Sequence, residues 1–194
     1  MILNDRRIRQ LCGYDGMVSP FEPELVRAVE GRKVISYGLS SFGYDIRLAA
    51  SEFRIFQRKP GEIVDPKRFD SANLIHSELQ QCDGDQFFIL PANSYALGVS
   101  VERFNLPRSL IGVCIGKSTY ARSGVIVNVT PMEPGWKGYL TIEVSNASSA
   151  DCRIYANEGI AQMLFLEGEP CEVSYADRSG KYQDQNQNVE LARV

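Results

Sequence analysis

Residues 116–146 read Gly116-Lys-Ser-Thr-Tyr-Ala-Arg-Ser-Gly-Val-Ile-Val-Asn-Val-Thr-Pro-Met-Glu-Pro-Gly-Trp-Lys-Gly-Tyr-Leu-Thr-Ile-Glu-Val-Ser-Asn146. A small polar loop is followed by a strand over 125–129, a Pro/Gly turn and a second strand with strict apolar/polar alternation. Because successive side chains of a strand point to opposite faces, Glu143 lies with Thr141 and Ser145 opposite the apolar face. The same unit supplies hydroxyls, a lysine and an arginine, which favours a functional carboxylate over a solvated strand glutamate.

Outside this unit the chain is mostly a series of short alternating segments. Strands are expected within residues 36–48, 52–57, 86–90, 95–101, 110–115, 153–155, 160–167 and 171–175. A short helix is expected over 2–11, capped by Asn4 or Asp5, and Gly43 indicates a bulge or a close backbone approach. Residues 24–30 fit a helical turn or a strand, 58–73 read as loop, and 74–80 are ambiguous. The pattern predicts a mainly β protein, a barrel or a sandwich.

Length and composition predict one compact domain with a polar extension. The chain has 194 residues, of which 44% are hydrophobic, and this is enough for one domain with an ample core. After Tyr175 the sequence turns polar and rich in Gly, Gln and Asn. We therefore expect a β-rich domain over 1–175 and a mobile tail over 176–194 that acts as a lid.

Charge, hydropathy and cysteine content indicate the class of ligand and the location of the protein. The net charge is −3 without a basic run, so a nucleic-acid polymer is not expected as a ligand. No stretch approaches the ~20 apolar residues of a membrane span, and no signal peptide is expected at the start. Five scattered cysteines indicate reduced thiols, and hence a cytoplasmic protein.

The content of ligand-forming residues also limits the chemistry. There is one histidine, His76, and no Cys-x-x-Cys, so the His/Cys cluster of a zinc hydrolase cannot be built. The phosphate-binding motif Gly-x-x-x-x-Gly-Lys-Ser/Thr and the dinucleotide-binding motif Gly-x-Gly-x-x-Gly are both absent. What remains is Glu143 with Ser118, Thr119, Lys117 and Arg122. This set fits a hydrolytic site without a protein-bound metal, in which a glutamate moves protons, a serine positions water, and cations and backbone amides hold phosphate.

Five segments in order carry a resemblance to a known family. They are Phe42-Gly-Tyr-Asp-Ile-Arg-Leu48, Gly116-Lys-Ser-Thr-Tyr-Ala-Arg122, Val127–Gly138 continued by Thr141-Ile-Glu143, Asn157-Glu-Gly-Ile-Ala-Gln162, and Ser174–Gln185. Each is short, but together and in this order they resemble the motifs of dCTP deaminases in the trimeric dUTPase-like superfamily. The resemblance implies a distorted β-barrel or jelly-roll-like subunit with short peripheral helices, in a homotrimer with sites between subunits.

The resemblance also implies an activity and a set of roles. The reaction is hydrolytic deamination of dCTP to dUTP and ammonia, which supplies dUTP toward dUMP and dTTP synthesis. Glu143 is the proton shuttle, Ser118 holds the water and Arg122 orients the base. Substrate contacts are implied for Lys117, Ser118, Thr119, Tyr120, Ala121, Arg122, Thr141, Ile142, Glu143, Gln162, Tyr175, Lys181 and Gln185. Magnesium enters on the triphosphate, without protein ligands, and zinc is not required.

Two departures from the family pattern leave alternatives open. Lys117 stands where arginine is common, and the turn 130–134 is short and lacks the Arg and Asp of other deaminases. A dUTP pyrophosphatase needs an Asp in this region and usually a Gly-rich arm with Phe-Gly-Ser, whereas this chain has Glu133 in the turn and Lys181-Tyr-Gln in the tail. Deamination is favoured, with a pyrophosphatase or bifunctional enzyme as the alternative and a non-catalytic nucleotide-binding trimer as the third reading.

Overall fold

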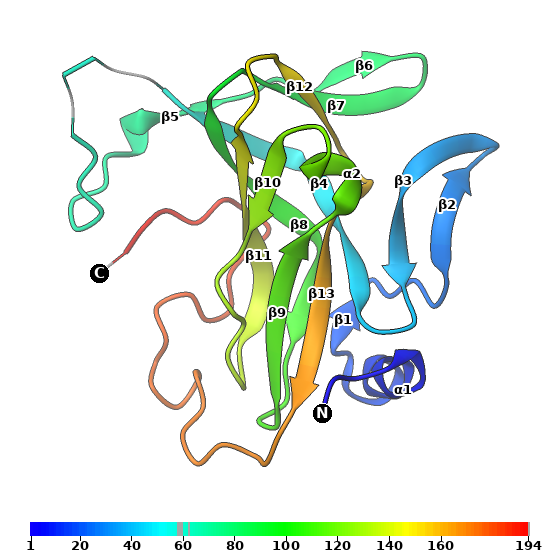
Figure 1. Cartoon of the computed structure of the whole chain (residues 1–194). Helices are drawn as coiled ribbons and strands as arrows, with labels where there is room; N and C mark the ends of the chain where they lie inside the picture. Colours follow the sequence, from blue (N-terminus) through cyan, green and yellow to red (C-terminus); the bar gives the residue numbers. More distant parts are fainter. Residues whose placement is uncertain (58–59, 62, 194) are drawn as a thin grey trace.

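The computed structural model describes residues 1–57, 60–61 and 63–193, and a curled β-sheet forms its centre (Figure 1). The path of this sheet runs through β10 (Val125–Asn128), β11 (Lys137–Asn146), β8 (Tyr95–Asn105), β4 (Tyr44–Phe56), β13 (Gly159–Glu167) and β9 (Leu110–Gly116). Curling brings its two ends together, so that Gly116 packs against Val127 and Gly112 bridges Met132. The prediction of a mainly β, distorted barrel is confirmed.

Shorter elements surround the curled sheet. They are β1 (Val18–Ser19) beside β8, β2 (Leu25–Val29) and β3 (Arg32–Leu39) as a hairpin beside β4, β5 (Leu74–His76) on β4, and a separate sheet of β12 (Cys152–Tyr155), β7 (Asp85–Leu90) and β6 (Gln80–Cys82). The helical elements are α1 (Asp5–Asp15), η1 (Ser71–Asn73) and α2 (Ser118–Ala121). The ambiguous segments 24–30 and 74–80 thus each contain a strand. The expected loop 58–73 lies partly outside the described residues, and its end forms η1.

Helix α1 follows from its caps and its apolar spacing. The side chain of Asn4 accepts a hydrogen bond from the Arg7 amide, and the helix ends where Gly16 takes a left-handed conformation with φ of 60°. Ile8 and Leu11 are buried on the inner face. The predicted helix exists, although it begins and ends later than the expected range of 2–11.

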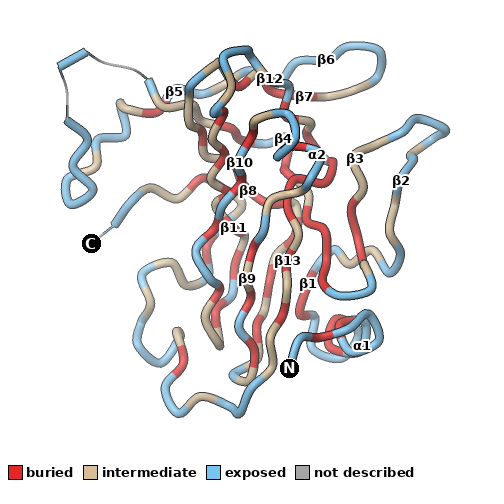
Figure 2. The backbone as a smooth tube through the Cα atoms, viewed as in Figure 1, coloured by how far each residue is buried: buried red, intermediate tan, exposed pale blue. Residues whose placement is uncertain are grey.

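The alternation along β11 decides which side chains form the core. Leu140, Ile142 and Val144 are buried, whereas the residues between them are half-buried (Figure 2). On β13 the same alternation buries Phe165, which packs near Phe104 of β8. Glu143 therefore projects from the opposite face of a well-anchored strand, as the sequence predicted.

The expected strand over 171–175 is wrong. The Cys171 amide bonds to the Arg108 carbonyl and the Tyr175 amide to the Pro134 carbonyl, so the segment contacts two separate loops. Val173 between them is exposed. Without one continuous neighbouring strand, an alternating sequence has no ladder to join. The last strand therefore ends at Glu167, some residues before the predicted domain boundary.

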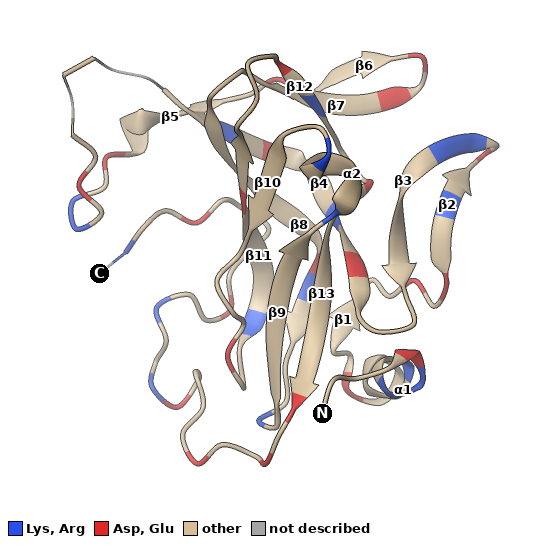
Figure 3. Ribbon diagram, in the orientation of Figure 1, with Lys and Arg blue, Asp and Glu red and all other residues tan. Residues whose placement is uncertain are grey.

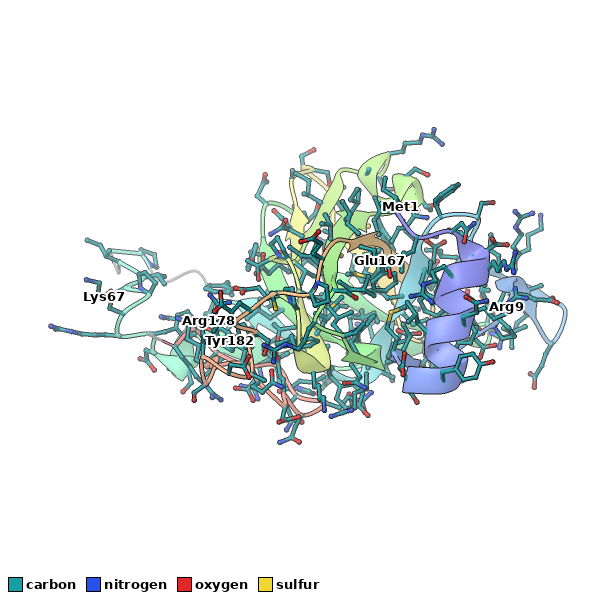
Figure 4. The ribbon with its side chains drawn as sticks, turned by 90° about the horizontal axis from the view of Figure 1, so that it is seen from below. Met1, Arg9, Lys67, Glu167, Arg178 and Tyr182 are labelled. Carbon is teal, nitrogen blue, oxygen red and sulfur yellow. The ribbon has the colours of Figure 1, made fainter. Side chains whose placement is uncertain are left out.

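The tail turns back along β11. Gln185 forms a parallel bridge with Gly138, and the Asp184 amide bonds to the Lys137 carbonyl at 2.9 Å. Further on, Val189 is buried, while Val194 lies outside the described residues. Figure 4 shows Tyr182 of this segment on the far side of the molecule from Arg9 of α1. The tail thus packs against the strand that carries Glu143.

Candidate active site

A cavity of about 840 Å³ lies over the polar face of β11. Thr141 and Glu143 line it from the strand, and residues 129–134 line it from the turn that precedes β11. Tyr175 lines it just before the tail, and the tail itself contributes Lys181 and Gln185 among other residues. One strand, one turn and the tail therefore enclose the carboxylate that the sequence singled out.

Glu143 is held by its neighbour across the strand pair. Asn128 of β10 is its register partner, and the Asn128 Nδ2 donates a hydrogen bond of 2.7 Å to the Glu143 Oε2. Among the described residues no hydrogen bond reaches the other oxygen, Oε1. One carboxylate oxygen is thus fixed while the other remains available to a ligand.

Two further groups near Glu143 stay protonated at neutral pH. Burial raises the pKa of Tyr95 to about 12, and the negative charge of Glu143 adds to the effect. Burial likewise raises the pKa of the Cys114 thiol to about 12, again with a contribution from Glu143. Both groups thus surround the carboxylate as neutral side chains.

An aromatic cluster forms one end of the cavity. Phe56 makes edge contacts with Phe69 and with Tyr95, at centroid distances of 5.8 and 5.2 Å. Leu97 continues this apolar wall. The cavity is therefore apolar at one end and polar where Glu143, Thr141 and the tail meet.

Tyr175, Lys181 and Gln185, three predicted contact residues, each make a hydrogen bond beside the cavity. Gln185 Nε2 donates to the Thr141 Oγ1 at 2.5 Å, and the Tyr182 amide donates to the Tyr175 hydroxyl at 3.0 Å. The Lys181 Nζ donates to the Arg193 carbonyl at 2.6 Å. Predicted residues far apart in sequence are thus brought together here.

The loop 117–122 does not line this cavity. It contains the short helix α2, in which the Tyr120 side chain is buried and its hydroxyl accepts a hydrogen bond of 2.9 Å from the Tyr155 amide. Ser118, Thr119, Ala121 and Arg122 are exposed. Within one chain, the predicted catalytic residues therefore fall into two separate places.

Lys117 and Gln162 lie with a buried carboxylate instead. The Lys117 Nζ is 2.5 Å from the Asp45 Oδ2 and 3.2 Å from the Ser36 Oγ. Gln162 Nε2 donates to the Ser40 Oγ at 3.2 Å. Burial raises the pKa of Asp45, and the nearby Lys117 opposes that effect. Ile142 is also outside the cavity lining, because its side chain is fully buried in the core.

Sequence reasoning did not find Asn128, Tyr95, Phe56 or Phe69. Asn128 becomes visible only through the register in which β10 pairs with β11, and Tyr95 through the pairing of β11 with β8. The alternation of each strand gave the facing of its own residues but not their cross-strand partners. Pairing the two strands of the 116–146 unit as a hairpin would have been the available signal for Asn128.

Metal-binding groups, membrane-spanning helices and disulfides bear on the class of the site. Within residues 1–57, 60–61 and 63–193, no group of three or more His, Cys, Asp or Glu side chains is placed to hold a metal ion. In the same part of the chain, every helix is too short or too polar to cross a bilayer. All five cysteines are free.

Comparisons with known proteins identify the family of this chain. Residues 2–168 match the family model described as dCTP deaminase-like. A dCTP deaminase of Acidithiobacillus ferrooxidans is 53% identical over 186 residues, which are 95% of each chain. A dCTP deaminase of Cupriavidus metallidurans is 51% identical over 194 residues, covering 100% of this chain and 99% of the relative.

A solved structure shares the fold at low sequence identity. The 2'-deoxycytidine 5'-triphosphate deaminase of Agrobacterium tumefaciens superposes with a TM-score of 0.57 at 16% identity. The match covers 86% of this chain and 48% of that one. Fold, sequence motifs and close relatives thus point the same way, and the chain belongs to the dCTP deaminase-like family.

Proposed function

We propose that this protein hydrolyses dCTP to dUTP and ammonia, and so supplies dUTP toward dUMP and dTTP synthesis. The observation that carries the proposal is Glu143, half-buried in a cavity with one carboxylate oxygen bonded and the other free. Relatives that are 51–53% identical along almost their whole length are dCTP deaminases, which supports dCTP as the substrate. In this role Glu143 is the proton shuttle of the reaction.

The reaction needs two proton transfers on the cytosine ring. Glu143 takes a proton from water while the water oxygen bonds to C4, and it delivers this proton to N3. It then moves the proton of the new C4 hydroxyl to the amino group, so that the C–N bond breaks and ammonia leaves. The C4 carbonyl of uracil remains. One carboxylate that alternates between base and acid is enough for both transfers.

The tail accounts for the rest of the nucleotide. Lys181, Gln185 and Tyr175 all line the cavity, where they would close over sugar and triphosphate. A lysine and an amide can meet phosphate oxygens through charge-assisted and neutral hydrogen bonds. Magnesium arrives as part of the substrate, bound to the triphosphate.

A homotrimer brings the second group of predicted residues to the first. Ser118 and Arg122 are exposed on a turn outside the cavity, so a neighbouring subunit would supply them to position water and base. Strands β9 and β10 carry no charged residue (Figure 3). Ile115 on β9 and Ile126 on β10 are 50% and 59% exposed. Exposed apolar side chains on a charge-free surface favour burial against another copy.

A second candidate, dUTP hydrolysis beside deamination, rests on Glu133. Its carboxylate lines the same cavity and pairs with Arg178 of the tail. A second acidic group near the triphosphate could activate water toward phosphorus. The ion pair occupies Glu133, which leaves deamination as the favoured activity.

The scattered cysteines, expected to be reduced, favour a cytoplasmic location.

Product analysis tests the proposal. The protein is incubated with dCTP and Mg²⁺, and the products are separated by ion-exchange chromatography while ammonia is measured by a coupled assay. We expect equal amounts of dUTP and ammonia. Formation of dUMP and pyrophosphate would identify the bifunctional enzyme, and binding of dCTP without any product would identify a non-catalytic trimer.

A further inference from the structure

The hydrogen bond to Glu143 comes from a residue whose position is unusually well fixed. Asn128 is the last residue of β10, and its register partner is Glu143 itself. Its neighbours in sequence, Val127 and Val129, are both buried. The backbone at Asn128 is therefore held on both sides by the core, while its side chain projects beside Glu143 on the outer face.

The chemistry of the two groups decides how the contact works. An ionised carboxylate has no proton to donate, so the amide nitrogen of Asn128 must face it, at 2.7 Å from Oε2. An amide does not titrate, so it cannot compete with Glu143 for the transferred proton. A neutral donor at fixed position thus distinguishes the two oxygens of a carboxylate that are otherwise equivalent.

We propose that Asn128 is a positioning residue for the reaction: its amide holds Oε2 of Glu143 and leaves Oε1 as the oxygen that carries the proton between water and the pyrimidine ring. This inference rests on the proposed function of Glu143. The role needs a hydrogen-bond donor of this length on this strand. A carboxylate at 128 would instead place a like charge next to Glu143.

Other groups around Glu143 do not provide the same contact. The titratable groups that share its surroundings are Tyr95 on β8, Cys114 on β9, Glu133 in the turn, and Tyr175, Lys181, Tyr182 and Glu190 at the tail. Tyr95 and Cys114 remain neutral. Glu133 pairs with Arg178, Glu190 with Arg193, and the Lys181 ammonium bonds to a backbone carbonyl. Among the described residues, Asn128 is thus the direct hydrogen-bond donor to Glu143.

The kinetic test compares Asn128→Ala, Asn128→Asp and Asn128→Gln with the matched control Ser145→Ala. Ser145 lies on the same face of β11, two positions from Glu143, opposite Ile126. We expect N128A and N128D to lower kcat by about 10- to 100-fold with little change in KM for dCTP, since a misplaced catalytic group costs factors of this order. N128Q, which keeps an amide, should recover part of kcat, and S145A should behave like the unsubstituted protein.

The pH profile separates positioning from a general structural role. In N128D two carboxylates share one place, so the acidic limb of the kcat profile should move to higher pH. Aspartate has the same shape as asparagine, so N128D still tests the positioning role if N128A does not fold. An unchanged kcat in both N128A and N128D would overturn the inference. Equal losses in kcat for N128D and N128Q, together with an unchanged pH profile of kcat in N128D, would also overturn it.

A measurement without turnover keeps this inference separate from the proposed function. Protein labelled with ¹³C at glutamate Cδ is examined by NMR at neutral pH, and the Glu143 resonance is assigned by its absence in Glu143→Gln. Loss of the donor in N128A removes the hydrogen bond to Oε2, so the Glu143 resonance should move from its position in the unsubstituted protein. Identical Glu143 resonances in the two proteins would refute the role of Asn128, whereas absence of dUTP formation by the unsubstituted protein would refute the proposed function.

Discussion

Glu143 can be tested by a change that preserves its shape. In Glu143→Gln the amide keeps the volume of the carboxylate and can no longer accept a proton from water. We expect a loss of dCTP turnover of about 10²–10⁴-fold, the usual contribution of a general acid–base group, with nucleotide binding and the trimer retained. Steady-state kinetics and calorimetric dCTP binding check this. A loss of less than about tenfold would show that another group moves the protons.

Two glycines provide a matched test of backbone constraint. Gly43 has φ of 100°, and a Cβ there would be 2.4 Å from the Met163 carbonyl oxygen, whereas a Cβ on Gly13 would meet nothing within 4 Å. Gly43→Ala should lower the free energy of unfolding by about 1–3 kcal/mol or more. Gly13→Ala, inside α1, should raise it by up to about 1 kcal/mol. Equal stabilities in urea denaturation would contradict the close approach.

At the level of residues, local rules predicted what depends on one segment. Alternation gave the facing of Glu143, and the glycine pattern gave the close approach at Gly43. The ion pair between Lys117 and Asp45 joins residues 72 positions apart, and no local rule connects them. The same limit hid the bond between Asn128 and Glu143, although these residues belong to one strand–turn–strand unit.

Among the elements, the strands were predicted well where a partner strand exists. The alternating sequence 171–175 looks like the true strands, but its backbone bonds go to separate loops. The loop 117–122 contains one turn of helix, α2, that its polar composition did not indicate. The error at 171–175 arises because an isolated segment contains no information about what lies beside it, whereas the hydrogen bonds of α2 lie within 117–122 itself.

The tail is the element whose behaviour should depend on nucleotide. Residues 176–194 are polar and include Gly180, so ordering them costs conformational entropy that contacts to a triphosphate would offset. Truncation after Ala176 should weaken dCTP binding sharply and leave the folded trimer intact, because the last strand ends at Glu167. Binding and sedimentation measurements on the truncated chain check both expectations.

Hydrogen exchange gives a direct view of the same element. The Asp184 amide bonds to the Lys137 carbonyl and the Val189 amide bonds to the Glu52 carboxylate, so both report on docking of the tail. We expect dCTP to increase protection over residues 178–186. Equal protection with and without nucleotide, or unchanged kinetics after truncation, would refute the lid.

For the whole molecule, assembly is the property to test first. Ile115→Lys or Ile126→Lys places a charge on the uncharged surface of β9 and β10, which should dissociate the proposed trimer and abolish turnover. Ile63→Lys, at a side chain that is 94% exposed on another part of the chain, is the control. Analytical ultracentrifugation measures the outcome. Trimers of unchanged stability in both variants would place the interface elsewhere.

The requirement for metal also belongs to the whole protein. One histidine and the absence of Cys-x-x-Cys predict that zinc is not needed. Activity should therefore survive treatment with a zinc chelator followed by dialysis into Mg²⁺. Elemental analysis is the parallel measurement, and stoichiometric zinc whose removal abolishes turnover would contradict the mechanism.

The sequence predicted the fold class, but it did not predict how the two ends of the sheet meet. Alternating strands and turn residues indicated a barrel or a sandwich, and the observed sheet is a curled barrel. That β9 and β10 meet at Gly116 and Val127 depends on sheet curvature, which no single strand encodes. Likewise, the separation of Ser118 and Arg122 from Glu143 appears only when the complete chain is folded.

The position of β13 within the sheet has a consequence for biosynthesis. This strand lies between β4 and β9 and also bonds to the N-terminus, where the Leu3 amide meets the Phe165 carbonyl. Residues 159–167 are synthesised after all the other strands of this sheet. Until then, β4 and β9 each have an unpaired edge, of the kind that associates with other chains. The nascent protein therefore completes its central sheet only when this last strand has emerged, and its dependence on chaperones should be greatest before that point.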